Sequence, residues 1–203
     1  MQIKKATFKQ SASSIFGCPK TNMQEYAFIG RSNVGKSSLI NMLCNNNKLA
    51  KTSATPGKTQ LINHFLINEH WFLVDLPGYG FAKTGKDQKV KIETIIFDYC
   101  KKREQLVCLF ILIDSRLELQ KIDLEFMLWC GENEIPFSLI YTKTDKNTKS
   151  QLVKNIKQIE EEILKHWEDL PNSFISSSEK KLGKEEILDF IDFNIKANQA
   201  SKA

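Results

Sequence analysis

One stretch of eight residues organises this sequence: Gly30-Arg31-Ser32-Asn33-Val34-Gly35-Lys36-Ser37. It fits the pattern G-x-x-x-x-G-K-[ST] at every position. A short apolar run, Tyr26–Ile29, precedes it, and a helical pattern that includes Leu39 and Leu43 follows it. A glycine-rich turn between a strand and a helix is typical of a loop that binds phosphate groups, so we name Gly30–Ser37 the phosphate loop.

The residues of the phosphate loop have separate predicted roles. Gly30 and Gly35 let the backbone turn tightly, so that successive N–H groups point at the β-phosphate of a nucleotide. Lys36 is expected to reach the β- and γ-phosphates, and Ser37 to offer its hydroxyl to the Mg²⁺ ion that bridges them. Because the match is complete, all eight residues are predicted nucleotide contacts.

A second motif closes the apolar run Trp71–Leu76. It has the pattern D-x-x-G and consists of Asp75-Leu76-Pro77-Gly78, named here the D-x-x-G segment. The Asp75 carboxylate is expected to hold Mg²⁺ through a water molecule, and the Gly78 N–H to sense the γ-phosphate. The pattern alone is common, but its position one hairpin after the phosphate loop is typical of nucleotide-dependent switches.

A third motif predicts the base of the nucleotide. The stretch Thr142-Lys143-Thr144-Asp145, named here the base motif, follows the apolar run Phe137–Tyr141 and matches the pattern [N/T]-K-x-D. A carboxylate at Asp145 can accept hydrogen bonds from N1–H and the exocyclic amine of guanine, whereas adenine would leave the charge unpaired. The stem of Lys143 can cover the purine face. The motif therefore favours guanine and disfavours an ATP-dependent kinase.

Two softer assignments complete the predicted site. The serine run Ser176-Ser177-Ser178 follows the weak strand Phe174-Ile175, where GTPases place a backbone N–H on guanine O6. The polar segment Thr52–Thr59 is the natural switch, and a threonine there should complete the Mg²⁺ shell; Thr59 is the first choice and Thr55 the alternative. The predicted nucleotide contacts of this region are Gly57, Lys58, Thr59, Gln60 and Leu61.

Short apolar runs alternate with helical patterns along the chain. Strands are expected at Tyr26–Ile29, Leu61–Ile67, Trp71–Leu76, Val107–Ile113, Phe137–Tyr141 and Phe174-Ile175, with a hairpin turn at Asn68-Glu69-His70. Helices are expected around Ile122, Phe126 and Trp129, around Leu152, Ile156, Ile159, Ile163 and Trp167, and around Ile187 or Leu188, Ile191 and Ile195. This order implies a mostly parallel sheet with helices on both faces, and ligands of such sheets bind beyond the carboxyl ends of the strands.

The composition indicates one ordinary cytoplasmic domain. The chain has 203 residues, of which 41% are hydrophobic and 26% charged, and its longest apolar stretch, Val107–Ile113, has the length of a strand. The start of the chain, Met1 to Gln10, has no apolar signal sequence, and the five scattered cysteines indicate neither a disulfide framework nor a zinc site. Residues 1–60 hold nine of the 29 basic and one of the 24 acidic residues, so this basic third can face phosphate groups, either of a nucleotide or of RNA.

Five segments together resemble one family more specifically than the shared nucleotide motifs do. They are Gly30–Asn41 (GRSNVGKSSLIN), Thr55–Asn63 (TPGKTQLIN), Asp75–Ala82 (DLPGYGFA), Asp114-Ser115-Arg116 and Thr142–Lys146 (TKTDK). From about Tyr26 to Ile195, the chain closely resembles the EngB family, also called YihA or YsxC, among the TrmE-Era-EngA-EngB-Septin-like bacterial GTPases. It departs from the family pattern at Ser176, where an aromatic residue is usual, which leaves the register of the serine run open by one residue.

This resemblance implies an α/β, three-layer, Ras-like P-loop NTPase fold with a six-stranded, mostly parallel sheet flanked by helices. It implies a GTPase domain at 25–197, with 1–24 as an extension of the same domain and 198–203 as a flexible tail. It also implies binding of GTP and GDP, hydrolysis of GTP, and Mg²⁺ held through Ser37 and Thr59. The implied role is in assembly of the large ribosomal subunit, with rRNA and ribosomal proteins as partners, and the protein is expected to be needed for normal cell division and septation. Apart from the resemblance, the sequence shows no long unexplained apolar surface, so a monomer that does not bind membranes is expected.

The catalytic mechanism is only partly predicted. Tyr79 stands where Ras-type enzymes carry the glutamine that positions the attacking water, and a phenol is a poor substitute. Asn33 is at the position where some potassium-stimulated GTPases use an asparagine to help hold K⁺. The expected catalytic residues are Lys36, Asn33 and Thr59. We expect slow intrinsic hydrolysis that is raised by K⁺ or by a ribosomal partner.

An alternative function is a nucleotide-gated switch that binds RNA or the ribosome with negligible intrinsic hydrolysis. An RNA-facing patch would then be formed by Lys83, Lys86, Lys89 and Lys91, for which a solvated helix face is an equally good interpretation.

Overall fold

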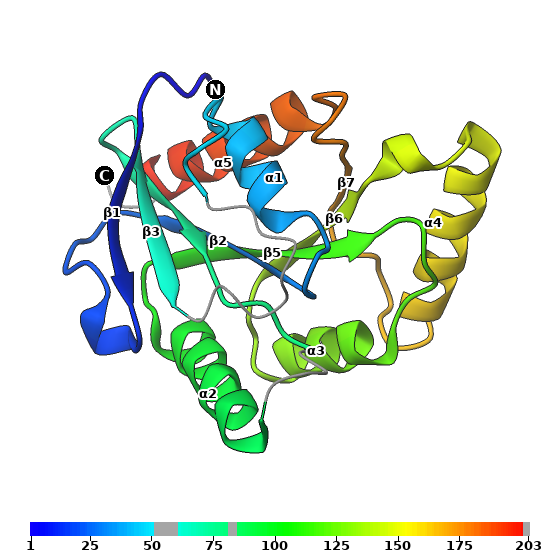
Figure 1. Ribbon diagram of the computed structural model, residues 1–203, viewed down its shortest axis with the longest axis horizontal. Helices are drawn as coiled ribbons and strands as arrows, with labels where there is room; N and C mark the ends of the chain where they lie inside the picture. Colours follow the sequence, from blue (N-terminus) through cyan, green and yellow to red (C-terminus); the bar gives the residue numbers. More distant parts are fainter. Residues whose placement is uncertain (51–60, 81–84, 201–203) are drawn as a thin grey trace.

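A seven-stranded sheet with helices on both faces forms the protein, as seen in the computed structural model (Figure 1). The structure describes residues 1–50, 61–80 and 85–200. The strands are β1 (Ala6–Ala12), β2 (Glu25–Gly30), β3 (Ile62–Ile67), β4 (Trp71–Asp75), β5 (Leu106–Asp114), β6 (Phe137–Thr142) and β7 (Ser173–Ile175). The helices are α1 (Lys36–Leu43), α2 (Lys86–Lys102), α3 (Lys121–Glu132), α4 (Lys149–Ile163) and α5 (Lys184–Ala200), with 3-10 turns η1 (Ile15–Gly17) and η2 (Thr144–Lys146).

The strand order is β1-β3-β4-β2-β5-β6-β7. Strands β4, β2, β5, β6 and β7 are parallel neighbours, whereas β3 pairs antiparallel with both β4 and β1. The expected hairpin joins β3 to β4 through residues 68–70. Because the parallel strands all end at the same edge, the segments that follow β2, β4, β5, β6 and β7 are brought together there.

The expectation of six strands is wrong, because the N-terminal segment adds β1. This strand pairs antiparallel with β3 at the edge of the sheet, with an irregularity between Phe8 and Gln10. Most of its side chains are exposed, so it lacks both the continuous apolar run of a buried strand and a regular alternation. An edge strand of this kind leaves little signal in a sequence.

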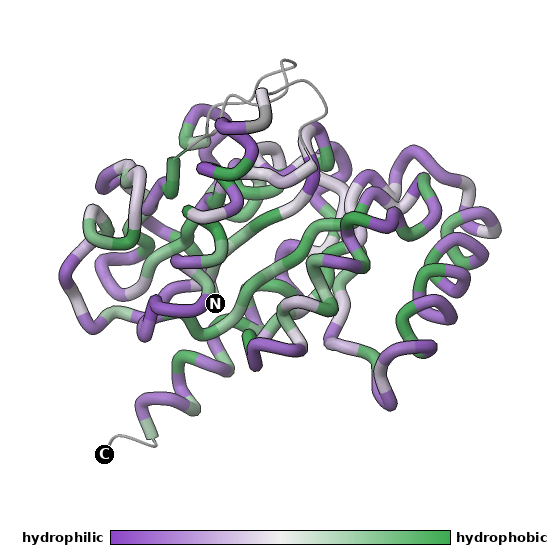
Figure 2. The backbone as a smooth tube through the Cα atoms, turned by 90° about the horizontal axis from the view of Figure 1, so that it is seen from below, coloured by the Kyte–Doolittle hydropathy of each residue, from purple (hydrophilic) through white to green (hydrophobic). Residues whose placement is uncertain are grey.

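The core consists of two apolar layers on opposite faces of the sheet. One layer contains buried residues of α2, α3 and α4, and the other contains those of α1 and α5. On β2, Tyr26 and Phe28 contribute to the second layer while Ala27 and Ile29 contribute to the first, as the two-residue period of a strand requires. Figure 2 shows hydrophobic residues concentrated along the central strands, with hydrophilic stretches on the outer helices.

Several smaller features complete the fold. Helix α4 ends at Ile163, so Trp167, which the helical spacing included, lies beyond the helix and contacts Phe137 with the ring centroids 6.2 Å apart. All five cysteines are buried and unpaired. Within the part of the chain that the structure describes, no helix has the length and apolarity needed to cross a bilayer.

Candidate functional site

The phosphate loop leaves the carboxyl end of β2 and enters α1, as the sequence predicts. Its backbone adopts left-handed conformations at Asn33, with φ 63°, and at Gly35, with φ 107°. A Cβ atom on Gly30 would lie 2.9 Å from the carbonyl oxygen of Leu112, so only glycine fits at that position. Helix α1 begins at Lys36. The N–H groups of its first turn, which have no partner within the helix, therefore lie at the end of the phosphate loop.

Lys36 of the phosphate loop meets Asp75 of the D-x-x-G segment. The Lys36 ammonium donates a hydrogen bond to Asp75 Oδ1, and both side chains are buried. This contact follows from the topology, because β2 and β4 are adjacent parallel strands. Ser37 follows on the first turn of α1 and is half-buried. A buried cation and a buried carboxylate at a phosphate loop can exchange partners with a polyphosphate and its counterion.

The base motif is fastened to the phosphate loop by side-chain hydrogen bonds. Lys143 has a left-handed backbone, with φ 58°. Its ammonium donates to Asn33 O at 2.6 Å and to Asp114 Oδ2 at 2.8 Å. The Thr142 hydroxyl donates to Val34 O at 2.7 Å. These bonds fix the spacing between the phosphate end and the base end of the site.

Asp114, at the end of β5, is a site residue that the motifs did not single out as a nucleotide contact. Burial would raise its pKa, but hydrogen bonds from Arg116 and Lys143 outweigh burial and lower the pKa of Asp114 to about 2. Arg116 donates from Nε at 2.9 Å and from Nη2 at 2.7 Å. The ionised carboxylate therefore orients Lys143 at neutral pH. Its sequence signals are its place directly after a buried apolar run and the segment Asp114-Ser115-Arg116 named in the sequence analysis.

Asp145 of the base motif is held by residues of two loops. Ser177 Oγ donates to Asp145 Oδ1 at 2.6 Å, and this hydrogen bond is the main reason why the pKa of Asp145 is lowered. Lys146 Nζ lies 3.3 Å from Asp145 Oδ2 and 2.8 Å from Glu179 Oε2. The carboxylate is therefore ionised and oriented, as an acceptor for two N–H donors must be.

The three serines of the serine run contribute unequally. The Ser176 N–H donates to Tyr141 O at 2.8 Å. The Ser177 N–H donates to Leu182 O at 3.2 Å. Ser178 lines the cleft described next, and its N–H makes no hydrogen bond within the described residues. Ser178 is therefore the member of the run whose N–H can serve a ligand.

A cleft of about 720 Å³ connects the phosphate loop to the base motif. Gly35, Asp145 and Ser178 all line it, together with residues of α1. Ligand sites in proteins commonly have volumes of roughly 300–1,000 Å³, and this cleft falls in that range. One cavity thus reaches from the glycine that precedes α1 to the carboxylate predicted to recognise the base.

The remaining predicted contacts divide into three groups. Leu76, Pro77 and Gly78 are buried, and the Leu76 N–H donates to Phe28 O at 3.0 Å. Leu61 is described and is exposed. The residues that lie outside the described ranges are Thr55, Gly57, Lys58, Thr59 and Gln60.

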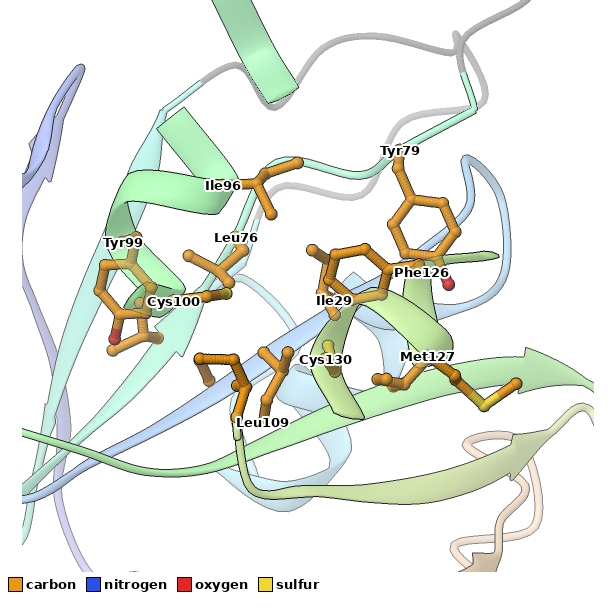
Figure 3. Packing of buried hydrophobic residues seen from close by; sticks show 14 of the residues in the cluster. Ile29, Leu76, Tyr79, Ile96, Tyr99, Cys100, Leu109, Phe126, Met127 and Cys130 are labelled. Carbon is orange, nitrogen blue, oxygen red and sulfur yellow. The ribbon is translucent and has the colours of Figure 1, made fainter. Parts of the chain in front are cut away.

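Tyr79, directly after the D-x-x-G segment, is a core residue. Its side chain is 6% exposed, and its ring packs on that of Phe126 in α3, with centroids 4.8 Å apart (Figure 3). Its N–H donates to Gly30 O at 3.3 Å. The position at which Ras-type enzymes carry a water-positioning glutamine is thus occupied by a ring packed against a helix.

Comparisons with known proteins point to one family. A family model described as "50S ribosome-binding GTPase" matches residues 25–143. A protein of Phocaeicola vulgatus named "Probable GTP-binding protein EngB" is 60% identical over 95% of this chain and 96% of its own length. A protein of Porphyromonas gingivalis with the same name is 58% identical over 95% of this chain and 96% of its own length.

Solved structures show the same fold. The crystal structure of a probable GTP-binding protein EngB superposes with a TM-score of 0.64 at 24% identity, covering 85% of this chain and 99% of the other. A structure of Era from Aquifex aeolicus, bound to GDP and aluminium fluoride, has a TM-score of 0.65 at 22% identity, covering 84% of this chain and 56% of the other. At such identities the likeness supports the P-loop GTPase fold.

Proposed function

Since the chain belongs to the EngB family of GTP-binding proteins, we propose that it hydrolyses GTP to GDP and acts as a nucleotide-dependent factor in large ribosomal subunit assembly. The observation that carries this proposal is the single cleft that Gly35 of the phosphate loop and Asp145 of the base motif both line. A cleft of this size supports the proposal that guanine binds at Asp145 while its phosphates pass Gly35 to the phosphate loop.

The base end supports guanine. Asp145 would accept hydrogen bonds from guanine N1–H and the exocyclic amine, because Ser177 holds its carboxylate ionised and oriented. The N–H of Ser178 would donate to guanine O6, since the other two serine N–H groups are already bonded. The stem of Lys143 would cover the purine face while its ammonium stays on Asn33 O and Asp114.

The phosphate end supports a polyphosphate with Mg²⁺. Lys36 would move its hydrogen bond from Asp75 to the β- and γ-phosphates, which frees the Asp75 carboxylate. The donor set fits Mg²⁺, because Ser37 offers a hydroxyl as a hard oxygen ligand and the Asp75 carboxylate, on an adjoining element, would hold the ion through a water molecule. Thr59 is proposed as the second protein ligand. Bound there, Mg²⁺ would neutralise charge that develops on the phosphates.

Slow intrinsic hydrolysis is part of the proposal. The burial of Tyr79 supports it, because a phenol packed into the core cannot orient the attacking water. Asn33, exposed on the phosphate loop with a left-handed backbone, is the proposed ligand for a stimulating K⁺ ion. Lys36 and Thr59 are the other proposed catalytic residues. A ribosomal partner would supply further stimulation.

A second candidate function is a nucleotide-gated binder of RNA or ribosomal protein with negligible hydrolysis. The charges of α2 favour it in part, because Lys89 and Lys91 are exposed there. Lys89 lies 3.7 Å from Glu93, which offsets part of that charge. Lys83 and the side chain of Lys86 lie outside the described residues.

The proposed setting follows from the proposed partner. Ribosomal subunits are assembled in the bacterial cytoplasm, so we place the protein there as a monomer that meets rRNA and ribosomal proteins. Its need in cell division and septation would then be a downstream effect of ribosome supply.

A titration of the purified protein with fluorescent GDP, competed by GTP, GDP or ATP in Mg²⁺ buffer, tests nucleotide recognition. Competition by the guanine nucleotides alone is expected, and equal competition by ATP would contradict the guanine assignment. GTP turnover is then measured in Na⁺ and in K⁺, with and without large ribosomal subunits. Stimulation by K⁺ or by the subunits is expected; subunit binding that depends on GTP without any turnover would favour the second function.

A further inference from the structure

The segment that follows α1 forms part of the cleft but belongs to none of the sequence motifs. It spans residues 44–50 and is named here the wall loop, because Asn45 and Asn47 line the cleft. The loop folds onto Asn41 of α1. The Asn41 amide donates to Asn47 O at 3.1 Å and to Ala50 O at 3.0 Å, and its oxygen accepts from the Ala50 N–H at 2.7 Å. Since Asn41 is buried, these bonds give the wall loop a defined shape.

A second loop, which joins β7 to α5, also lines the cleft. It spans residues 176–183, carries the serine run, and is named here the serine loop. Ser177 and Leu182 close it by exchanging backbone hydrogen bonds of 3.2 Å and 3.0 Å. Its last residue, Gly183, has φ 79°, and a Cβ atom there would collide with Ile175 O, so only glycine fits. The residue that follows, the first of α5, therefore starts from a fixed backbone position.

Lys184 is that residue, and its side chain joins the two loops. Helices α1 and α5 pack together in one layer of the core, which brings Lys184 to the end of α1 (Figure 1). The Lys184 ammonium donates to Met42 O at 3.0 Å and to Asn45 Oδ1 at 2.5 Å. Met42 O belongs to the last turn of α1, where a cation also meets the negative end of the helix. One ammonium thus ties the wall loop to the start of α5, directly after the serine loop.

We propose that Lys184 is a positioning residue that holds the wall loop against the serine loop and so slows the release of guanine nucleotides. This proposal rests on the proposed function, in which the nucleoside lies in the cleft that both loops line. Without the ammonium, each nucleotide that binds would have to order the wall loop itself, and this cost weakens binding. The wall loop adjoins the end of α1 opposite the phosphate loop, so the release of GDP and of GTP should be affected alike.

The test measures how fast fluorescent GDP dissociates from the full-length protein when an excess of unlabelled GDP is added. Lys184→Met keeps an unbranched stem and removes the ammonium with its two hydrogen bonds, so dissociation should become about tenfold faster. A fluorescent, non-hydrolysable GTP analogue should show the same acceleration. The matched control is Lys196→Met, which removes an ammonium that lies 2.7 Å from Asp192 near the other end of α5. It should leave the dissociation rate within about twofold of the wild type.

Asn45→Gly adds a second variant, because it removes the acceptor of Lys184 while glycine retains the left-handed backbone, φ 50°, of that position. If Lys184 acts through the wall loop, Lys184→Met should accelerate dissociation less in the Asn45→Gly background than in the wild type. An unchanged rate in Lys184→Met, an equal acceleration by Lys196→Met, or full additivity with Asn45→Gly would overturn the proposal while leaving the guanine-nucleotide site intact. Failure of the wild-type protein to bind fluorescent GDP would instead refute the proposed function itself.

Discussion

Buried charges lie at both ends of β2, and the two ends differ in how completely those charges are paired. At the amino end, Glu25 accepts hydrogen bonds from the Tyr99 hydroxyl at 2.6 Å and from Arg103 at 3.0 Å and 2.5 Å. At the carboxyl end, Lys36 and Asp75 form a pair at the phosphate loop. A closed network fixes the elements that it joins, whereas a simple pair can exchange one partner for a ligand. The buried charges at the amino end of β2 therefore stabilise the fold, whereas those at the carboxyl end can bind a ligand.

The closed network of the amino end connects distant segments. Arg103, just after α2, donates to Pro19 O at 2.7 Å as well as to Glu25. His64 of β3 lies with Nε2 3.5 Å from Glu25 Oε2. The first residue of β2 thus joins α2, β3 and the segment after η1.

Breaking the closed network should have the largest effect. Glu25→Gln keeps the shape of the side chain but leaves the Arg103 guanidinium buried without its counter-charge. We expect the free energy of unfolding, measured in urea, to fall by about 3–5 kcal/mol. The matched control is Glu162→Gln, which removes an exposed pair with Lys165 and should cost less than about 1 kcal/mol. Equal effects of the two substitutions would contradict the contrast between the ends of β2.

Asp114, at the carboxyl end of the neighbouring strand β5, offers a smaller, pH-dependent effect. Its pKa is lowered from 3.8 to about 2 in the folded protein, so its stabilisation is present above about pH 4 and is lost as the pH falls toward 2. We expect Asp114→Asn to be less stable than the wild type by about 1–2 kcal/mol at pH 6. The difference should shrink as the pH falls from 4 toward 2, as measured by urea unfolding. A difference that does not change with pH would show that the charge of Asp114 contributes nothing.

The smallest predicted effect concerns the orientation of Asp145. Ser177→Ala removes the hydroxyl that holds this carboxylate, so GDP affinity should fall about three- to tenfold in the fluorescence titration. Ser150→Ala, at an exposed serine near the start of α4, is the control and should leave GDP affinity unchanged. An unchanged affinity in Ser177→Ala would mean that Asp145 needs no support from the serine run.

The sheet and its motifs were predictable because their signals are local. Continuous apolar runs located β5 and β6, and the G-x-x-x-x-G-K-[ST] and [N/T]-K-x-D patterns located two loops at the ends of parallel strands. Parallel topology then brings those loops together without further information. Strand β1 escaped prediction because a sheet edge places few of its side chains in the core.

The contacts that tune the site were not predictable in this way, because they join segments far apart in the chain. Lys143 meets Asp114 across 29 residues, and Arg31 meets Asp123 across 92. No local pattern encodes such a pair. The burial of Tyr79 likewise depends on where α3 packs, which the residues around Tyr79 do not specify.

The recognition of guanine by Asp145 is the central claim, and a change of base specificity tests it most directly. In xanthine a carbonyl replaces the exocyclic amine of guanine, so the carboxamide introduced by Asp145→Asn can donate to that oxygen and accept from N1–H. We expect this variant to lose affinity for GDP by about 100-fold or more and to gain affinity for xanthosine diphosphate. Asp169→Asn, at an exposed aspartate, should change neither affinity. Retention of GDP binding by Asp145→Asn, with no binding of the xanthosine nucleotide, would contradict the account.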